Sequence, residues 1–170
     1  SDYVLNTWIK RRDWDSVREF FKNPPKEEES LMTVLNSSED DGETALHIAC
    51  RKDAPIDIII SITEACGKNA VSKCNAYGNS SPLHHACHYN ASPNVIQYLI
   101  KVGGHEAAST ADDIGNLPLH WALSKRLSRE IIILLIERGG RDTVTQTNKI
   151  GWTALHTASF FDADNETISY

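Results

Sequence analysis

The sequence lacks a long apolar run and an apolar leader. Its longest uninterrupted apolar run, 131–136, has six residues, whereas a membrane-spanning helix needs about 20. The first residues carry charges and no apolar core of the kind that signal peptides have. We therefore expect a soluble, cytoplasmic protein that neither spans nor binds a membrane.

Basic blocks and dense cysteine are also missing. The chain has 17 Lys and Arg against 23 Asp and Glu, for a net charge of −6, and the basic residues are scattered. A nucleic-acid-binding surface needs a concentrated basic patch, so nucleic acid is excluded as a partner. Four cysteines in 170 residues are too few for a disulfide-stapled domain, so we expect reduced thiols.

What the chain does contain is enough apolar material for one domain and a clear internal repeat. Hydrophobic residues make up 41% of the 170, so residues 1–170 are predicted to form a single domain. Four histidines, each followed two residues later by alanine, recur at intervals of 37, 36 and 36 residues. They are His47, His84, His120 and His156. A period of this length is typical of stacked repeats.

Each unit contains signals for two helices. Thr44, Ser81 and Thr153 are expected N-caps, and Pro82 and Pro118 suit the first helical position. Leu117 lacks the capping hydroxyl, so Asn116 is a shifted substitute. The second helices are predicted at 56–66, 93–102 and 128–138, because these segments are dense in Ile, Leu and Val. The run 131–136 alone favours a strand, but its place in the repeat predicts a helix.

Glycines and polar residues separate the units. Gly67, Gly103 and Gly139 recur every 36 residues after apolar stretches, which predicts left-handed glycines beyond the helix ends. About ten polar residues follow each glycine, and we expect them to form turns or short hairpin fingers. The second finger has one extra residue near Gly78 and Asn79. A helix pair with a turn cannot bury its own apolar face, so the units must stack into an all-α solenoid.

The motifs Thr-Ala-Leu-His, Ser-Pro-Leu-His and Leu-Pro-Leu-His resemble those of the ankyrin-repeat family. The resemblance implies a fold of helix-turn-helix repeats, with short first helices that line a concave surface where protein partners bind. It predicts an N-terminal cap at 3–22, an insertion and first finger at 23–40, repeats at 41–76, 77–112 and 113–148, and a truncated last repeat at 149–170. The second helix of that last repeat would begin near 165–168.

The sequence shows no catalytic constellation. No phosphate-binding glycine loop, nucleophile elbow or His-Glu-x-x-His motif is present, so we expect no enzyme activity and no cofactor. His84, His85 and His88 could suggest a zinc site, but the resemblance gives His84 a structural hydrogen bond near the cap and leaves His85 and His88 facing outward. We therefore expect no metal. Cys50 and Cys87 lie one stacking step apart, too far for a disulfide.

The predicted function is non-catalytic binding of a protein partner on the concave helix and finger surface. A targeting or regulatory domain of a larger enzyme or channel is the alternative, and the chain is expected to be a monomer or a fragment. The acids at 39–41 are either a solvated loop or a weak steering patch for a basic partner. Trp121 and Phe160 could instead be stacking residues. The candidate partner-binding residues, carried over from the family by position, are Ile48, Arg51, Lys52, Tyr77, His85, His88, Tyr89, Trp121, Lys125, Trp152, Phe160 and Phe161.

Overall fold

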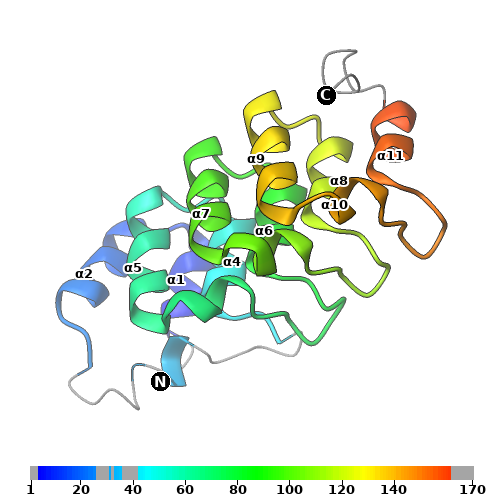
Figure 1. Cartoon of the computed structure of the whole chain (residues 1–170). Helices are drawn as coiled ribbons and strands as arrows, with labels where there is room; N and C mark the ends of the chain where they lie inside the picture. Colours follow the sequence, from blue (N-terminus) through cyan, green and yellow to red (C-terminus); the bar gives the residue numbers. More distant parts are fainter. Residues whose placement is uncertain (1–3, 26–30, 32, 36–41, 162–170) are drawn as a thin grey trace.

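The computed structural model describes residues 4–25, 31, 33–35 and 42–161, and within them the chain is a two-layer stack of helices (Figure 1). The described residues contain no β-strand. The elements are α1 (Val4–Arg11), α2 (Trp14–Lys22), α4 (Ala45–Arg51), α5 (Ile56–Cys66), η1 (Lys68–Val71), α6 (Pro82–His88), α7 (Pro93–Ser109), α8 (Pro118–Ser124), α9 (Arg129–Gly139), α10 (Asp142–Thr145) and α11 (Ala154–Phe160). The expected all-α solenoid is confirmed.

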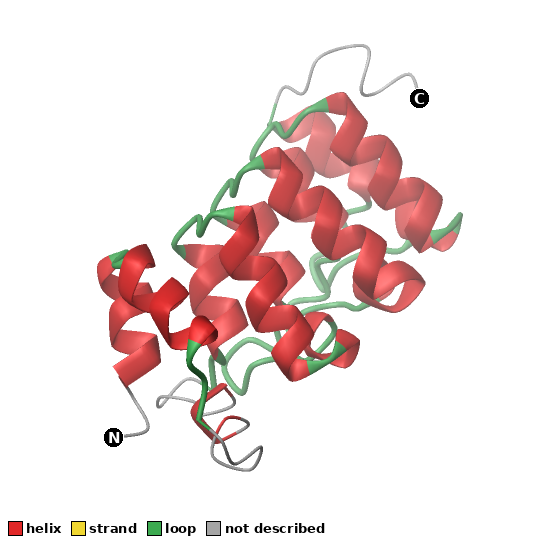
Figure 2. Cartoon of the chain, turned by 90° about the vertical axis from the view of Figure 1, so that its left-hand side faces the viewer, coloured by secondary structure: helices red, strands yellow, loops and turns green. Residues whose placement is uncertain are grey.

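The two layers follow from the alternation of short and long apolar helices. The short helices α1, α4, α6, α8 and α11 contact one another in sequence and form the inner layer, while α2, α5, α7 and α9 form the outer layer. Figure 2 shows the loops that connect successive pairs running along one side of the stack. The apolar run 131–136 lies within α9, so stacking overrides its preference for a strand.

The inner helices begin where the caps predict. Thr44, Ser81 and Thr153 are the N-caps of α4, α6 and α11, and Pro82 opens α6. The prediction that Asn116 substitutes for a capping hydroxyl is wrong. Leu117 itself is the N-cap of α8, and the Asn116 side-chain oxygen instead accepts a hydrogen bond from Asn148 Nδ2 at 2.9 Å.

The glycines that end the outer helices differ from the prediction by one position. Gly67 is left-handed as expected, but in the next two units Gly104 and Gly140 take positive φ, at 58° and 81°, while Gly103 and Gly139 stay helical. A Cβ atom at Gly103 would lie 2.4 Å from the Cβ of Ala107. Glycine at this position therefore permits close packing, and its successor supplies the turn.

The segments after these glycines also contain helical turns, which their polar composition did not predict. The chain forms η1 after Gly67, a continuation of α7 to Ser109, and α10 after Gly140. Each turn buries a side chain against the outer layer: Val71, Ala107 and Thr143 are all buried. The polar loops are therefore shorter than the predicted ten residues. The residues just after each glycine form a helical turn that packs against the outer layer.

The fingers close by hydrogen bonds between a side chain and the backbone. Asn75 Oδ1 accepts from the Ser80 N–H at 2.8 Å, and Asn148 Oδ1 accepts from the Trp152 N–H at 2.9 Å. The Asn75 finger spans one residue more than the Asn148 finger, as predicted, and Asn79 takes a positive φ of 49° there. Neighbouring fingers are also linked, for example by the Lys149 N–H donating to the Ile114 carbonyl at 2.9 Å.

Some predictions lie outside the described residues. These are most of the insertion at 23–40, the acids at 39–41 and the second helix of the last unit near 165–168. All four cysteines are free thiols, and Cys50 and Cys87 are buried.

Truncation of equivalent leucines should reveal how stability is distributed along the stack. Leu119 on α8 is fully buried between neighbours, whereas Leu155 at the same position of α11 is 54% exposed. We expect Leu119→Ala to lower the free energy of unfolding by about 2–5 kcal/mol and Leu155→Ala by less than about 1 kcal/mol. Denaturant titration of both variants measures the difference, and equal losses would show that α11 is covered.

Candidate functional site

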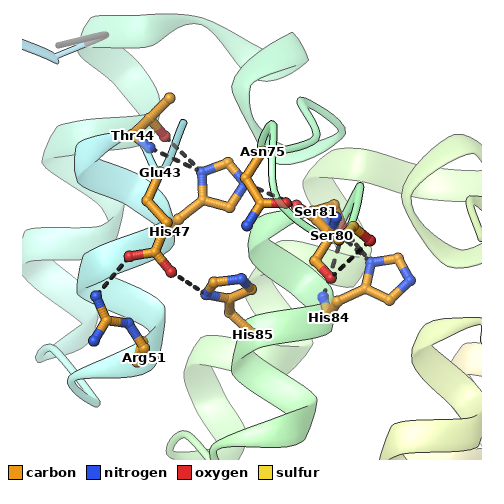
Figure 3. Close-up of polar contacts among 10 residues, drawn as sticks. Glu43, Thr44, His47, Arg51, Asn75, Ser80, Ser81, His84 and His85 are labelled. Carbon is orange, nitrogen blue, oxygen red and sulfur yellow. Dashed lines mark hydrogen bonds and ion pairs between the residues drawn. The ribbon is translucent and has the colours of Figure 1, made fainter. Parts of the chain in front are cut away.

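In three successive repeats, a histidine ties the start of one inner helix to the finger of the next repeat. The Thr44 N–H donates to His47 Nδ1 at 3.2 Å, so the proton is on Nε2, which donates to the Ser80 carbonyl at 3.0 Å (Figure 3). His84 and His120 repeat the arrangement with the carbonyls of the next two fingers, at 3.1 and 3.2 Å. We call these three side chains the histidine ladder.

The ladder depends on neutral imidazoles. Burial lowers the pKa of His47 to about 3 and that of His84 to about 4, and it also lowers the pKa of His120. Because both ring nitrogens are used, His84 has no free lone pair for a metal. No group of three or more His, Cys, Asp or Glu side chains suited to a metal lies within the described part of the chain.

The inner surface contains a cavity beside the second finger, which we call the first groove. Its volume is about 380 Å³. It is lined by Glu43, Arg51, Asn75, Tyr77, Gly78, Ser80, His84, His85, His88, Tyr89 and Trp121. The groove therefore brings together side chains from α4, α6, α8 and the Asn75 finger.

One wall of the first groove is an ion-pair cluster. The Glu43 carboxylate accepts from Arg51 Nη2 and lies 3.4 Å from His85 Nδ1 (Figure 3). The His85 ring also packs edge-on against His47, with ring centroids 5.3 Å apart. The expectation that His85 faces outward is wrong, because Glu43 and Tyr89 help to cover it and leave it 8% exposed. Burial lowers the pKa of His85.

The other wall is aromatic and is held by one carboxylate. His88 packs edge-on against Trp121 with ring centroids 4.4 Å apart, and against Tyr89 at 4.7 Å. Trp121 Nε1 donates to Asp112 Oδ2 at 2.9 Å. The other oxygen of Asp112 accepts from two backbone N–H groups of its finger, including that of Asn116 at 2.8 Å. Asp112 therefore fixes the indole relative to the finger.

A second groove of about 280 Å³ adjoins the first. It is lined by Asn116, His120, Trp121, Ser124, Lys125, Asn148, Ile150, Trp152, Thr157 and Phe161. Trp121 belongs to both grooves, so the two lie next to each other along α6, α8 and α11. Phe160 packs on Trp152 with ring centroids 4.8 Å apart and extends the aromatic side.

The structure brings most of the predicted binding residues into these grooves. Those that line one or both grooves are Arg51, Tyr77, His85, His88, Tyr89, Trp121, Lys125, Trp152 and Phe161. Phe160 borders the second groove through Trp152. Lys52 lines neither groove. The prediction for Ile48 is wrong, because its side chain is fully buried in the core between inner helices.

Asp112, which positions Trp121, was not among the residues predicted from the sequence. A signal was available, because Asn75, Asp112 and Asn148 open their fingers at intervals of 37 and 36 residues. Of these three, Asp112 has a second oxygen that accepts from a side chain. The hydrogen bond from Trp121 to that oxygen forms only in the folded chain, and no repeated spacing in the sequence predicts it.

The stacked helix pairs, the histidine ladder and the fingers define a solenoid repeat protein. A family model described as ankyrin repeats (three copies) matches residues 10–105 and again 56–147. The chain therefore belongs to the ankyrin-repeat family, whose members are generally protein–protein interaction modules. The search of curated proteins found no significant match. None of the helices in the described ranges is long and apolar enough to cross a bilayer.

Acid should weaken the fold through the histidine ladder. The pKa of His84 is near 4 in the folded chain and 6.5 unperturbed, so the unfolded chain binds this proton first as the pH falls. The stability contributed by neutral His84 is complete above pH 6.5 and is lost as the pH falls towards 4, at up to about 1.4 kcal/mol per pH unit. Denaturant titrations from pH 7 to 4.5 should give His84→Gln a shallower slope than wild type.

The control for this experiment is His105→Gln, because His105 is exposed and outside the ladder. Its pH slope should match that of the wild type. A wild-type slope equal to that of His84→Gln would contradict a neutral buried His84.

Asp112→Asn should release Trp121 without opening the finger. Asparagine closes the equivalent turns at Asn75 and Asn148, so the backbone bonds should persist. Its amide cannot accept from the indole N–H while its one oxygen accepts from the finger backbone. We expect the Trp121 indole N–H, assigned by NMR with Trp121→Phe, to exchange at least tenfold faster, in line with the loss of about 1.4 kcal/mol. Unchanged exchange would mean that ring packing alone holds the indole.

Proposed function

We propose that this chain is a non-catalytic recognition module that binds a protein partner across the two grooves. The observation that carries the proposal is that Trp121, a side chain fixed by both Asp112 and His88, lines both grooves. A rigid aromatic side chain loses little conformational entropy on binding, so it makes an effective anchor.

The placement of the remaining aromatic residues also supports binding at this surface. Tyr89 is 49% exposed and Phe160 is 67% exposed, although both rings pack against neighbouring aromatic rings. Exposed aromatic side chains that border a cavity are typical of interface centres. The ion pair of Glu43 and Arg51 also lines the first groove and would form part of the polar rim.

Truncation of two groove aromatics tests the proposal. The chain is immobilised, and the proteins that it captures from a lysate are identified and quantified for the wild type and for Tyr89→Ala and Trp152→Ala. At a true anchor, each substitution should weaken binding by roughly 2 kcal/mol or more, which is about thirtyfold in affinity. The melting temperature should stay nearly unchanged, because both side chains lie at the surface.

The control variants are Lys101→Ala and Glu137→Ala, which alter exposed side chains of the outer helices α7 and α9. They should retain every partner. If the outer-helix variants lose a partner that Tyr89→Ala and Trp152→Ala both retain, the binding surface is on the outer layer and the proposal is wrong.

A further inference from the structure

The charges of the grooves differ in sign from those of the chain as a whole. Among the described residues that line the two grooves, only Glu43, Arg51 and Lys125 carry a formal charge at neutral pH. Glu43 and Arg51 form an ion pair and offset each other. Lys125 is exposed and leaves the lining residues with one unpaired positive charge, in a chain whose net charge is −6, while the buried Asp112 carboxylate lies behind Trp121.

Hydrogen-bonding groups at the first groove are also unbalanced. Arg51 Nε and His88 Nδ1 are buried and have no hydrogen-bond partner. Arg51 Nε can only donate. Asp112 is buried beside the grooves, but its two oxygens already accept from Trp121 and from the finger backbone. Arg51 Nε is therefore a donor at the first groove that lacks an acceptor.

Apolar surface lies directly beside the positive charge. Lys125 follows Trp121 by one helical turn, and both side chains line the second groove with Trp152 and Phe161. A ligand that places an acceptor at Lys125 would therefore have an aromatic wall for the neighbouring group. Burial lowers the pKa of His88, and the nearby Lys125 ammonium lowers it further.

We infer that the partner presents an acidic segment, in which Asp or Glu carboxylates alternate with apolar side chains. One carboxylate pairs with Lys125, and the adjacent apolar side chain packs on Trp121 and Trp152. This inference rests on the proposed function, because it assigns a chemical class to the occupant of the same grooves. A basic segment is disfavoured because no unpaired carboxylate lines either groove among the described residues.

A peptide selection on the intact chain tests the inference. A display library of random 16-residue peptides is selected against the wild type, Lys125→Glu, Lys101→Glu and the double variant Tyr89→Ala/Trp152→Ala. Lys101→Glu makes the same charge change on the outer helix α7, so it controls for the overall charge of the chain. The best wild-type peptides are then titrated against all four proteins by fluorescence anisotropy.

The wild type and Lys101→Glu should enrich peptides in which Asp or Glu stands beside Leu, Phe or Trp. We expect such a peptide to bind Lys125→Glu at least about tenfold more weakly and Lys101→Glu within about twofold of wild type, with an affinity that falls as salt is added. A basic or uncharged consensus overturns the inference, as does equal weakening by Lys101→Glu.

The double variant separates this inference from the function on which it rests. If the selected peptides have no acidic bias but fail to bind Tyr89→Ala/Trp152→Ala, the grooves remain the binding site and only the acidic class of partner is rejected. Peptides that bind the double variant as tightly as wild type would reject the grooves. If the wild type enriches no peptide relative to the double variant, both the acidic segment and the grooves are rejected as the basis of peptide binding.

Discussion

The hydrogen bond from a buried histidine to the finger of the next repeat is the interaction on which the stack depends. His47, His84 and His120 each accept a cap N–H at Nδ1 and donate from Nε2 to a carbonyl 32 or 33 residues further along the chain. One side chain thus satisfies a polar group of its own helix and one of its neighbour. Since an unmade buried hydrogen bond costs more than a made one gains, the neutral imidazole fixes the relative position of successive repeats.

The second recurring device is the Asn or Asp that closes each finger, and the recognition surface arises from it. At 75 and 148 an asparagine uses its side-chain oxygen for the turn. At 112 an aspartate does the same and has a second oxygen left over, which holds Trp121. A carboxylate in place of the amide at this structural position therefore preorganises a half-buried aromatic side chain. Fold and binding surface share this residue.

The repeat period predicted the features that each unit needs by itself. It placed the caps at Thr44 and Ser81 and gave the bounds of α5 correctly. It failed where the structure of one segment depends on contact with another segment of the chain. The helical turn at α10 has a polar sequence, yet it forms because Thr143 packs on Gly139. His85 was expected to face solvent, but contact with Glu43 from the preceding repeat buries it. Spacing along one chain cannot show such contacts, because they depend on which units become neighbours.

The position directly after the repeated histidine explains why the candidate surface is central. It holds Ile48, His85, Trp121 and Thr157. Ile48 is fully buried and lines neither groove, whereas His85, Trp121 and Thr157 all line a groove. The same position therefore packs the core in α4 and contributes to a groove in α6, α8 and α11. Helices α6 and α8 have a neighbour on each side, so the side chains that they present are the best fixed, and a rigid anchor binds with the smallest loss of entropy.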